Sequence, residues 1–214
     1  MASTEGTTEY IYEDSELNHS HSYILPSLMD ILNNLPNMGM GDDRRVFELG
    51  CGNGAVAYEM TKVGFEVTGV DPSTQGIAQA NTHHPELKLS VGSAYDDLRT
   101  SYGQFPLVVS LEVVEHVYYP RKYAATLHEL VLPGGIAIVS TPYHGYWKNL
   151  ALALTGKMDK HFTALWDDGH IKFWSIATLT TLLNEAGFEV LKTKRVGRIP
   201  ILAMSMIIVA RKKP

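Results

Sequence analysis

A glycine-rich turn placed directly after a short apolar run constrains this sequence more than any other feature. The run covers Arg45 to Leu49, and the turn at residues 50–54 reads GCGNG. Glycine lets the backbone bend sharply there and lets a ligand approach without meeting a Cβ atom. The next apolar run, Phe65 to Val70, is followed by Asp71, about 20 residues after the first glycine, which is the spacing of a ribose-binding carboxylate. The pattern predicts a strand, turn and helix that bind a nucleoside-containing ligand.

The same alternation of apolar runs and helical patterns continues along the chain. Strands are predicted at 45–49, 65–70, 87–91, 107–111, 135–140, 188–196 and 202–210. Helices are predicted at 22–34, 55–63, 74–82, 121–131 and 175–186. Runs that are apolar on both faces and alternate with helices are typical of a covered parallel sheet, and the last two runs are close enough to pair antiparallel. The predicted fold class is α/β, a Rossmann-like three-layer sandwich with a seven-stranded, mostly parallel sheet and an antiparallel C-terminal hairpin.

Charge and cysteine content narrow the classes of partner and compartment. The net charge of -5 argues against a broad basic surface for nucleic acid, so a small-molecule partner is favoured and no nucleic acid is expected. The single cysteine, Cys51, excludes an intrachain disulfide and fits a reducing cytoplasm. The N-terminal residues lack the features of a signal peptide, and no apolar run reaches the roughly 20 residues that cross a bilayer. We therefore expect a cytoplasmic protein without a membrane span, and its oligomeric state stays open.

A second chemically distinctive segment follows the fourth predicted strand, where residues 112–117 read EVVEHV. If the chain turns helically there, Glu112, Glu115 and His116 project to one side. Two carboxylates and an imidazole suit Mg²⁺, Mn²⁺ or Zn²⁺, and His170, in a polar loop before the last helix, is the expected fourth ligand. In a metal-free alternative, His116 alone acts as general base on an acceptor hydroxyl, and the glutamates bind the backbone or the substrate.

Two motifs resemble those of class I S-adenosylmethionine-dependent methyltransferases. Residues 48–54 (ELGCGNG) look like the first motif of that family, which has an acidic residue before the glycines, and residues 132–135 (LPGG) look like its L-x-P-G-G turn. The glycine turn alone would equally suit a nicotinamide dinucleotide, so the second motif matters. The resemblance implies that S-adenosylmethionine is the cofactor, with the glycine turn on its methionine and ribose, Asp71 on both ribose hydroxyls, and Ser93 and Ala94 beside the adenine. The implied cofactor-binding residues are Glu48, Gly50, Cys51, Gly52, Asp71, Ser93, Ala94 and Leu111.

The E-x-x-E-H run at residues 112–116 is similar to that of the polyprenyl-dihydroxybenzoate and demethylubiquinone O-methyltransferases of ubiquinone biosynthesis. It is also similar to that of the small-RNA 3′-terminal 2′-O-methyltransferases, in which two glutamates and two histidines hold a metal, and the G-H-x-x-F-W stretch at 169–174 resembles their second histidine segment. From these resemblances we expect O-methylation of a hydroxylated small molecule, with His116 and Glu115 as catalytic residues. The alternatives are a metal-dependent nucleic-acid 2′-O-methyltransferase and a cofactor-binding regulator without turnover.

The chain length of 214 residues favours one main domain with an N-terminal extension. We expect the extension at 1–44, with a helix that packs over the cofactor pocket, and the methyltransferase domain at 45–214. The family architecture suggests that Tyr12, His21 and Tyr23 close one side of that pocket. An insertion at 141–174 is rich in aromatic residues, which suits either a lid that excludes water or a satellite core.

Overall fold

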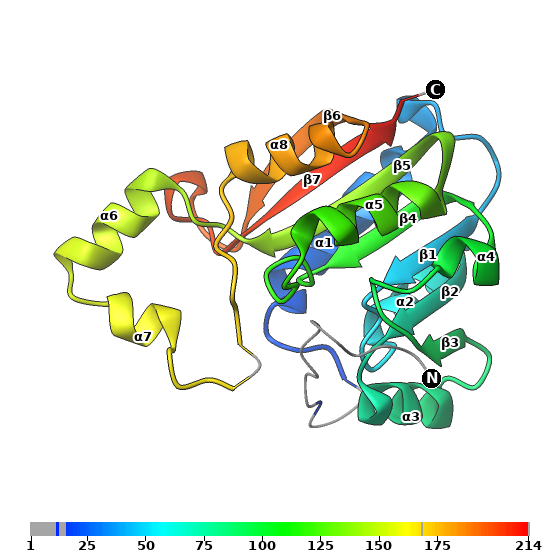
Figure 1. The fold of residues 1–214 in the computed structure, drawn as a ribbon, viewed down its shortest axis with the longest axis horizontal. Helices are drawn as coiled ribbons and strands as arrows, with labels where there is room; N and C mark the ends of the chain where they lie inside the picture. Colours follow the sequence, from blue (N-terminus) through cyan, green and yellow to red (C-terminus); the bar gives the residue numbers. More distant parts are fainter. Residues whose placement is uncertain (1–11, 13–15, 168, 214) are drawn as a thin grey trace.

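Parallel strands make up most of the sheet in the computed structural model of the protein, which describes residue 12 and residues 16–167 and 169–213. Within these residues, seven strands run in the order β3-β2-β1-β4-β5-β7-β6. The parallel strands are β1 (Arg45–Leu49), β2 (Glu66–Asp71), β3 (Lys88–Val91), β4 (Phe105–Leu111) and β5 (Val131–Pro142). The strands β6 (Phe188–Val196) and β7 (Ser205–Lys212) pair antiparallel, and β7 also pairs antiparallel with β5. The predicted mostly parallel sheet and its C-terminal hairpin are confirmed (Figure 1).

Helices cover both faces of the sheet and complete the three predicted layers (Figure 1). One layer contains α1 (His21–Asn34), α2 (Ala55–Lys62) and α3 (Thr74–His83). The other contains α4 (Leu98–Tyr102), which was not predicted, with α5 (Pro120–Leu130) and α8 (Ile176–Glu185). The apolar residues of each layer join a separate core cluster against the sheet. Because both of its faces are covered, β4 is buried along its whole length.

The first helix is part of the hydrophobic core. Ile24, Leu28, Ile31 and Leu32 recur at the spacing of one helical face and are all buried, and a short 3-10 helix, η1 (Pro36–Met38), follows α1. Truncation of one such leucine to alanine typically costs about 2 to 5 kcal/mol of stability. Residues 1–11 and 13–15 of the predicted extension lie outside the described residues. The division of the chain at residue 44 stays a prediction.

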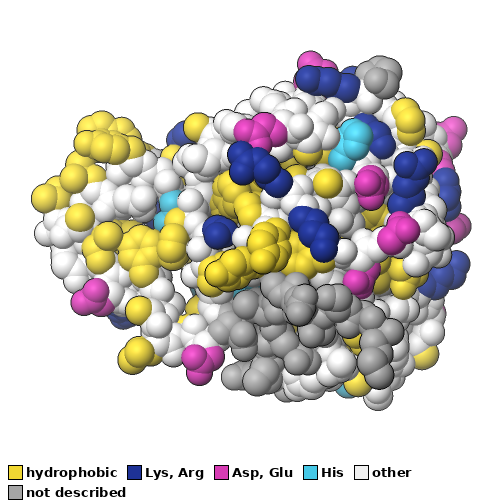
Figure 2. Space-filling view, in the orientation of Figure 1, with side chains coloured by type: hydrophobic (Ala, Val, Ile, Leu, Met, Phe, Trp, Pro, Cys, Tyr) yellow, Lys and Arg dark blue, Asp and Glu magenta, His cyan; other side chains and the backbone are white. Residues whose placement is uncertain are grey.

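Two segments differ from the sequence-based prediction. The last strand begins at Ser205 instead of residue 202, because Pro200 has no N–H for a strand ladder and instead opens the 3-10 helix η2 (Pro200–Leu202). The insertion at 141–174, of which residue 168 is outside the described part, forms α6 (Tyr146–Leu154) and α7 (Met158–Phe162). These two helices project from the sheet (Figure 1), and hydrophobic side chains gather on their surface (Figure 2).

The strand order indicates which edge of the sheet binds a ligand. It reverses between β1 and β4, which pair in parallel and therefore end side by side. Open α/β sheets bind ligands in the crevice outside the carboxyl ends of the strands at such a reversal. The glycine turn after β1 and the segment 112–117 after β4 thus meet at one edge. In the described residues, no helix has both the length and the apolar character needed to span a membrane.

Candidate active site

A cavity of about 750 Å³ lies at this edge of the sheet. Its size is within the range of small-molecule binding sites. The walls come from the glycine turn, the end of β2, the segment after β4, the N-terminal end of α1, the insertion with α6 and α7, and the connection between β6 and β7. The glycine turn and the second polar segment therefore share one space, in which a cofactor and a second small molecule can meet.

Hydrogen bonds to the end of β2 fix the glycine turn. The N–H groups of Gly50 and Cys51 donate to the carbonyl oxygen of Val70 at 2.8 and 3.1 Å, and the N–H of Gly52 donates to Oδ2 of Asp71 at 2.9 Å. Gly50 and Gly52 have φ angles of 88° and 53°, in the left-handed region that favours glycine. A Cβ atom would collide with Val113 at the first position and with Tyr12 at the second. Both glycines are therefore required by backbone conformation and by close packing.

Most of the predicted cofactor-binding residues line the cavity. Those that do are Glu48, Gly50, Cys51, Gly52, Asp71, Ala94 and Leu111. Ser93 is the exception, because it is buried behind the wall and its Oγ accepts a hydrogen bond from the N–H of Tyr95 at 3.1 Å. The side chain of Ser93 shapes the turn after β3, whereas its neighbours Gly92 and Ala94 lie at the cavity surface, and the place of Ser93 beside the adenine stays a prediction.

Glu48 is a buried carboxyl group at the wall of the cavity. It is 2% exposed, and its Oε2 atom has no hydrogen-bond partner among the described residues. Burial, and then the nearby charge of Asp71, raise the pKa of Glu48 well above its ordinary value. Buried polar atoms nearly always have partners, so an oxygen without one beside a cavity is a place where a ligand donor fits.

The segment after β4 does not continue as the helix considered from its sequence. Glu112 has a φ of 55°, which ends any helical path at its first residue, and its N–H donates to the carbonyl oxygen of Ser140 at 3.1 Å. Its carboxylate accepts hydrogen bonds from the hydroxyls of Ser140 and Ser205 at 2.7 and 3.1 Å. Glu112 lines the cavity but does not belong to the cluster formed by the other three predicted metal ligands, because these two serines hold its side chain on β5 and β7.

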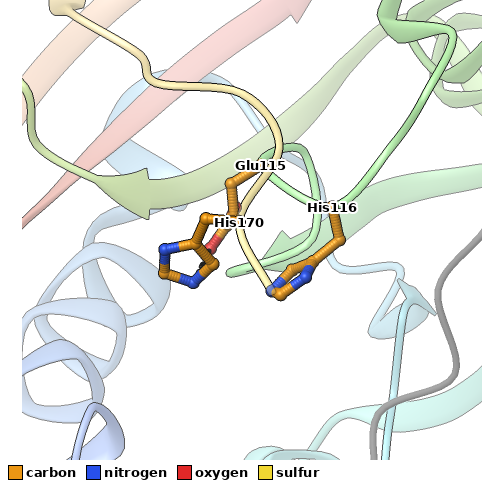
Figure 3. A group of neighbouring side chains, drawn as sticks. All are labelled: Glu115, His116 and His170. Carbon is orange, nitrogen blue, oxygen red and sulfur yellow. Dashed lines mark ion pairs between the residues drawn. The ribbon is translucent and has the colours of Figure 1, made fainter. Parts of the chain in front are cut away.

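Glu115, His116 and His170 come together (Figure 3). One ligand atom of each lies within 4.8 Å of the others. The Oε2 atom of Glu115 accepts a hydrogen bond from Thr141 at 2.9 Å, whereas Oε1 has no hydrogen-bond partner among the described residues and lies 4.0 Å from Nε2 of His170. Glu115 is 1% exposed, and both imidazoles line the cavity in front of it. Two imidazole nitrogens and one carboxylate oxygen therefore lie close enough together to bind the same ion.

Burial sets the protonation of this cluster. It is the main cause that lowers the pKa of His170 to about 4, and the nearby His116 lowers it further. Burial also raises the pKa of Glu115 well above its ordinary value, and the neighbouring Glu112 adds to this effect. His170 is therefore neutral at physiological pH, with a lone pair available for a proton or a cation.

The aromatic insertion contributes both to the core and to the cavity. Tyr143 is buried in the core, whereas Tyr146 and Trp147 are exposed on α6. The ring of Trp166 lies 6.1 Å from that of His116 and 5.1 Å from that of His170, measured between centroids. Tyr143 thus belongs to the core and Trp166 lies at the cavity, and a lid that excludes water stays a prediction. On the other side of the cavity, the three N-terminal residues suggested by family architecture also line the wall, namely Tyr12, His21 and Tyr23.

Several cavity residues were not found from the sequence. His144 lies just after β5, so the rule that ligands bind at the carboxyl ends of strands would have indicated it. Lys148 on α6, Arg198 after β6 and Ser205 at the start of β7 carry no comparable signal. Their place in the cavity depends on how β7 inserts between β5 and β6 and on where α6 projects.

The reversed strand order, the glycine turn hydrogen-bonded to an acidic residue and the shared cavity define a protein that binds a nucleoside-containing cofactor. Residues 21–193 match the protein family described as "Methyltransferase domain". The chain belongs to this family and is a class I S-adenosylmethionine-dependent methyltransferase. The match begins at the first residue of α1, so it includes the helix that joins the core.

Among curated proteins, the chain is 40% identical over 116 residues to "Ubiquinone biosynthesis O-methyltransferase" of Caulobacter sp. (strain K31). This alignment covers 52% of the chain and 46% of the relative. A protein with the same name from Azorhizobium caulinodans is 34% identical over 154 residues, which cover 68% of the chain and 58% of the relative. The chain spans about half the length of the curated relatives it matches.

Solved structures share the fold at low sequence identity. Magnesium protoporphyrin IX methyltransferase from Synechocystis PCC 6803 with bound SAH has a TM-score of 0.65 and 18% identity, over 89% of this chain and 82% of that one. A [4+2]-cyclase has a TM-score of 0.67 and 14% identity, over 99% and 88% of the two chains. Since one of these neighbours is named a cyclase, the fold alone does not define the reaction.

Proposed function

We propose that this protein transfers the methyl group of S-adenosylmethionine to a hydroxyl oxygen of a small molecule. The observation that carries the proposal is the convergence of Glu115, His116 and His170 at the cavity that also contains the glycine turn. A pure cofactor-binding protein has no need of such a cluster. The names of the curated relatives support oxygen as the accepting atom.

The cofactor end of the cavity matches the needs of S-adenosylmethionine. The carboxylate of Asp71 accepts hydrogen bonds from the ribose hydroxyls, and Gly50 and Gly52, which line the cavity without side chains, let the methionine portion lie close to the turn. The unpartnered Oε2 of Glu48 accepts a donor of the bound molecule. When bound, the cofactor supplies a methyl group on a positively charged sulfur, which leaves as a thioether while the acceptor oxygen forms the new bond to carbon.

His116 takes the proton of the acceptor hydroxyl. An imidazole at the cavity wall is suited to this task because a neutral ring has one nitrogen that accepts a proton. Glu115, buried behind the two histidines, positions the cluster through its hydrogen bond with Thr141. Trp166 packs beside the histidines and limits the access of water to the reacting atoms.

The same three side chains fit a divalent cation. The fit rests on the open Oε1 of Glu115 and on two imidazoles within reach of it, and a set of two nitrogens and one oxygen suits Mn²⁺ or Zn²⁺ better than Mg²⁺. When bound, a cation lowers the pKa of an acceptor hydroxyl. In that version His116 and His170 are ligands, and in the metal-free version His116 is the general base. The two versions share the same acceptor chemistry.

A nucleic-acid acceptor is less well supported. It calls for a lysine and arginine groove around Lys148, Lys157, Lys160 and Lys172. Lys148 is buried in the cavity wall, and only Lys157 of the other three lines the cavity. A lysine buried in a cavity wall does not form part of an exposed groove along a phosphate backbone.

Calorimetric titration of metal-stripped protein tests the proposal. The protein is titrated first with S-adenosylmethionine and then with Mn²⁺, Zn²⁺ and Mg²⁺, beside His116→Ala and an exposed control, His83→Ala on α3. Transfer of a labelled methyl group to a panel of phenols and catechols is measured in parallel. Cofactor binding, transfer to oxygen and its loss only in His116→Ala support the proposal, and a metal signal lost in that variant selects the metal version. Failure to bind the cofactor, or full transfer by His116→Ala, contradicts it. Cofactor binding without transfer to any acceptor favours a regulator.

A further inference from the structure

A second polar cluster occupies the cavity wall away from the glycine turn. It contains Lys148 on α6, His161 on α7 and Arg198 in the connection between β6 and β7, and none of them belongs to the cluster of Glu115, His116 and His170. Lys148 is only 8% exposed. Among the described residues, its ammonium group donates one hydrogen bond, to the carbonyl oxygen of Met204 at 3.3 Å, although an ammonium carries three donors.

The charge of Lys148 is not balanced by an ion pair among the described residues. In the part of the chain that the structure describes, no ion pair within 4.0 Å involves Lys148 or Arg198. The carboxylate of Glu112 is the negative charge that acts on Lys148. Its two oxygens, however, already accept hydrogen bonds from the hydroxyls of Ser140 and Ser205. One carboxylate also cannot balance two cations. A buried cation without a paired anion is unfavourable, so this wall is incomplete as it stands.

The three groups lie close enough to influence one another. Burial lowers the pKa of Lys148 to about 8, and the charge of Arg198 lowers it further, against an opposing effect of Glu112. Burial also lowers the pKa of His161, followed by the charges of Lys148 and Arg198. The Nε2 atom of His161 is buried without a hydrogen-bond partner among the described residues. Lys148, His161 and Arg198 therefore face the same cavity, where the ammonium group of Lys148 has donors available for a ligand.

We propose that Lys148, His161 and Arg198 form a subsite for an oxyanion, a carboxylate or a phosphate, carried by the methyl acceptor. The assignment of the anion to the methyl acceptor rests on the proposed function. An oxyanion completes the hydrogen bonds of Lys148, and the guanidinium of Arg198 offers it two parallel donors. The wall beside it is apolar at Ala151, Leu152 and Phe162. The acceptor is thus a hydroxylated molecule that combines an anionic group with an apolar body, and neutral analogues bind less well.

Anion binding to the SAH-saturated protein tests this subsite. Benzoate, phenyl phosphate and inorganic phosphate are titrated by calorimetry, with benzamide as the neutral control and the same titrations repeated without SAH. We expect saturable binding of at least one anion, with benzoate and phenyl phosphate distinguishing a carboxylate from a phosphate site. Lys148→Met should weaken that binding about tenfold or more, as expected for loss of a charge-assisted hydrogen bond. Lys192→Met, at an exposed position on β6, should leave it unchanged.

Three results overturn the subsite. They are the absence of anion binding to the wild type with and without SAH, equal binding by Lys148→Met, and equal affinity for benzoate and benzamide. A fourth is a loss of SAH affinity in Lys148→Met, which would assign Lys148 to the carboxylate of the cofactor itself. Arg198→Gln, at an exposed position, provides a second variant that should fold normally and weaken the same anions. If SAH does not bind the wild type but anions do, the proposed function fails and the anion site remains.

Discussion

The Nε2 atom of His170 lies 4.0 Å from Oε1 of Glu115, and the backbone of Glu115 itself holds the histidine loop in place. The carbonyl oxygen of Glu115 accepts hydrogen bonds from the N–H groups of Ile171 and Lys172 at 2.9 and 3.0 Å. The loop position is therefore set by main-chain atoms, and the chemistry of the cluster by side chains. A side-chain substitution can therefore change the chemistry of the cluster without moving the loop.

Replacement of His170 by asparagine should reduce methyl transfer while the protein stays folded. The main-chain bonds to Glu115 remain, and the imidazole is 29% exposed, so little core packing is lost. We expect a loss in kcat of about tenfold or more, the usual effect of removing a group that acts at the reacting atoms. Thermal melts and steady-state kinetics check both parts. A variant with full activity would show that His170 has no part in the reaction.

Asp71→Asn should weaken S-adenosylmethionine binding. The carboxylate accepts the Gly52 N–H at 2.9 Å and the Ser73 N–H at 2.8 Å, and it is the proposed acceptor for the ribose hydroxyls. An amide loses the charge that strengthens these bonds, so the dissociation constant should rise about tenfold or more. Calorimetry with Glu86→Gln as an exposed control measures this. Unchanged affinity would place the ribose elsewhere.

Gly50→Ala should destabilise the protein and reduce cofactor affinity. The added Cβ meets the side chain of Val113, and the φ of 88° is strained for any residue other than glycine. The double variant Gly50→Ala/Val113→Ala should recover part of the lost stability, because it relieves the collision and leaves the backbone strain. Chemical denaturation of both variants provides the comparison. Identical stabilities would mean that the valine contact does not limit this position.

The stability of the cofactor-free protein should depend on the ionisation of Glu48. Burial and Asp71 raise the pKa of Glu48 in the folded state above its unfolded value, so the folded state binds the extra proton. The stabilisation from this proton is complete below the unfolded pKa and is lost as the pH rises through the folded pKa. Glu48→Gln should remove this loss and become more stable than the wild type as the pH rises from about 5 to about 8.

Urea denaturation over that pH range measures the effect. Glu189→Gln, at an exposed carboxyl group on β6, serves as the matched control and should follow the wild type. If the free energy of unfolding of Glu48→Gln falls with pH as steeply as that of the wild type, Glu48 is not the group responsible.

The sequence by itself determined the fold class and the cofactor turn. Buried strands alternate with helices because a parallel sheet needs cover on both faces, and this requirement leaves a local pattern in the chain. The turn at residues 50–54 and Asp71 are also local signals, since positive φ angles favour glycine and a carboxylate follows the next strand. His116 and Glu115 follow β4 directly, so the rule for strand ends was enough to find them.

The tertiary structure alone decided the composition of the acceptor end. Glu112 leaves the cluster because Ser140 and Ser205 bind it, and Ser205 reaches that place only through the insertion of β7 beside β5. Lys148 and Arg198 line the same cavity although they come from distant segments that share no sequence pattern. Contacts between distant segments depend on strand order and on burial, and neither leaves a periodic trace in the sequence. The proposed cofactor site is therefore readable from local sequence, whereas only the assembled fold places Lys148, Arg198 and Ser205 at the proposed acceptor site.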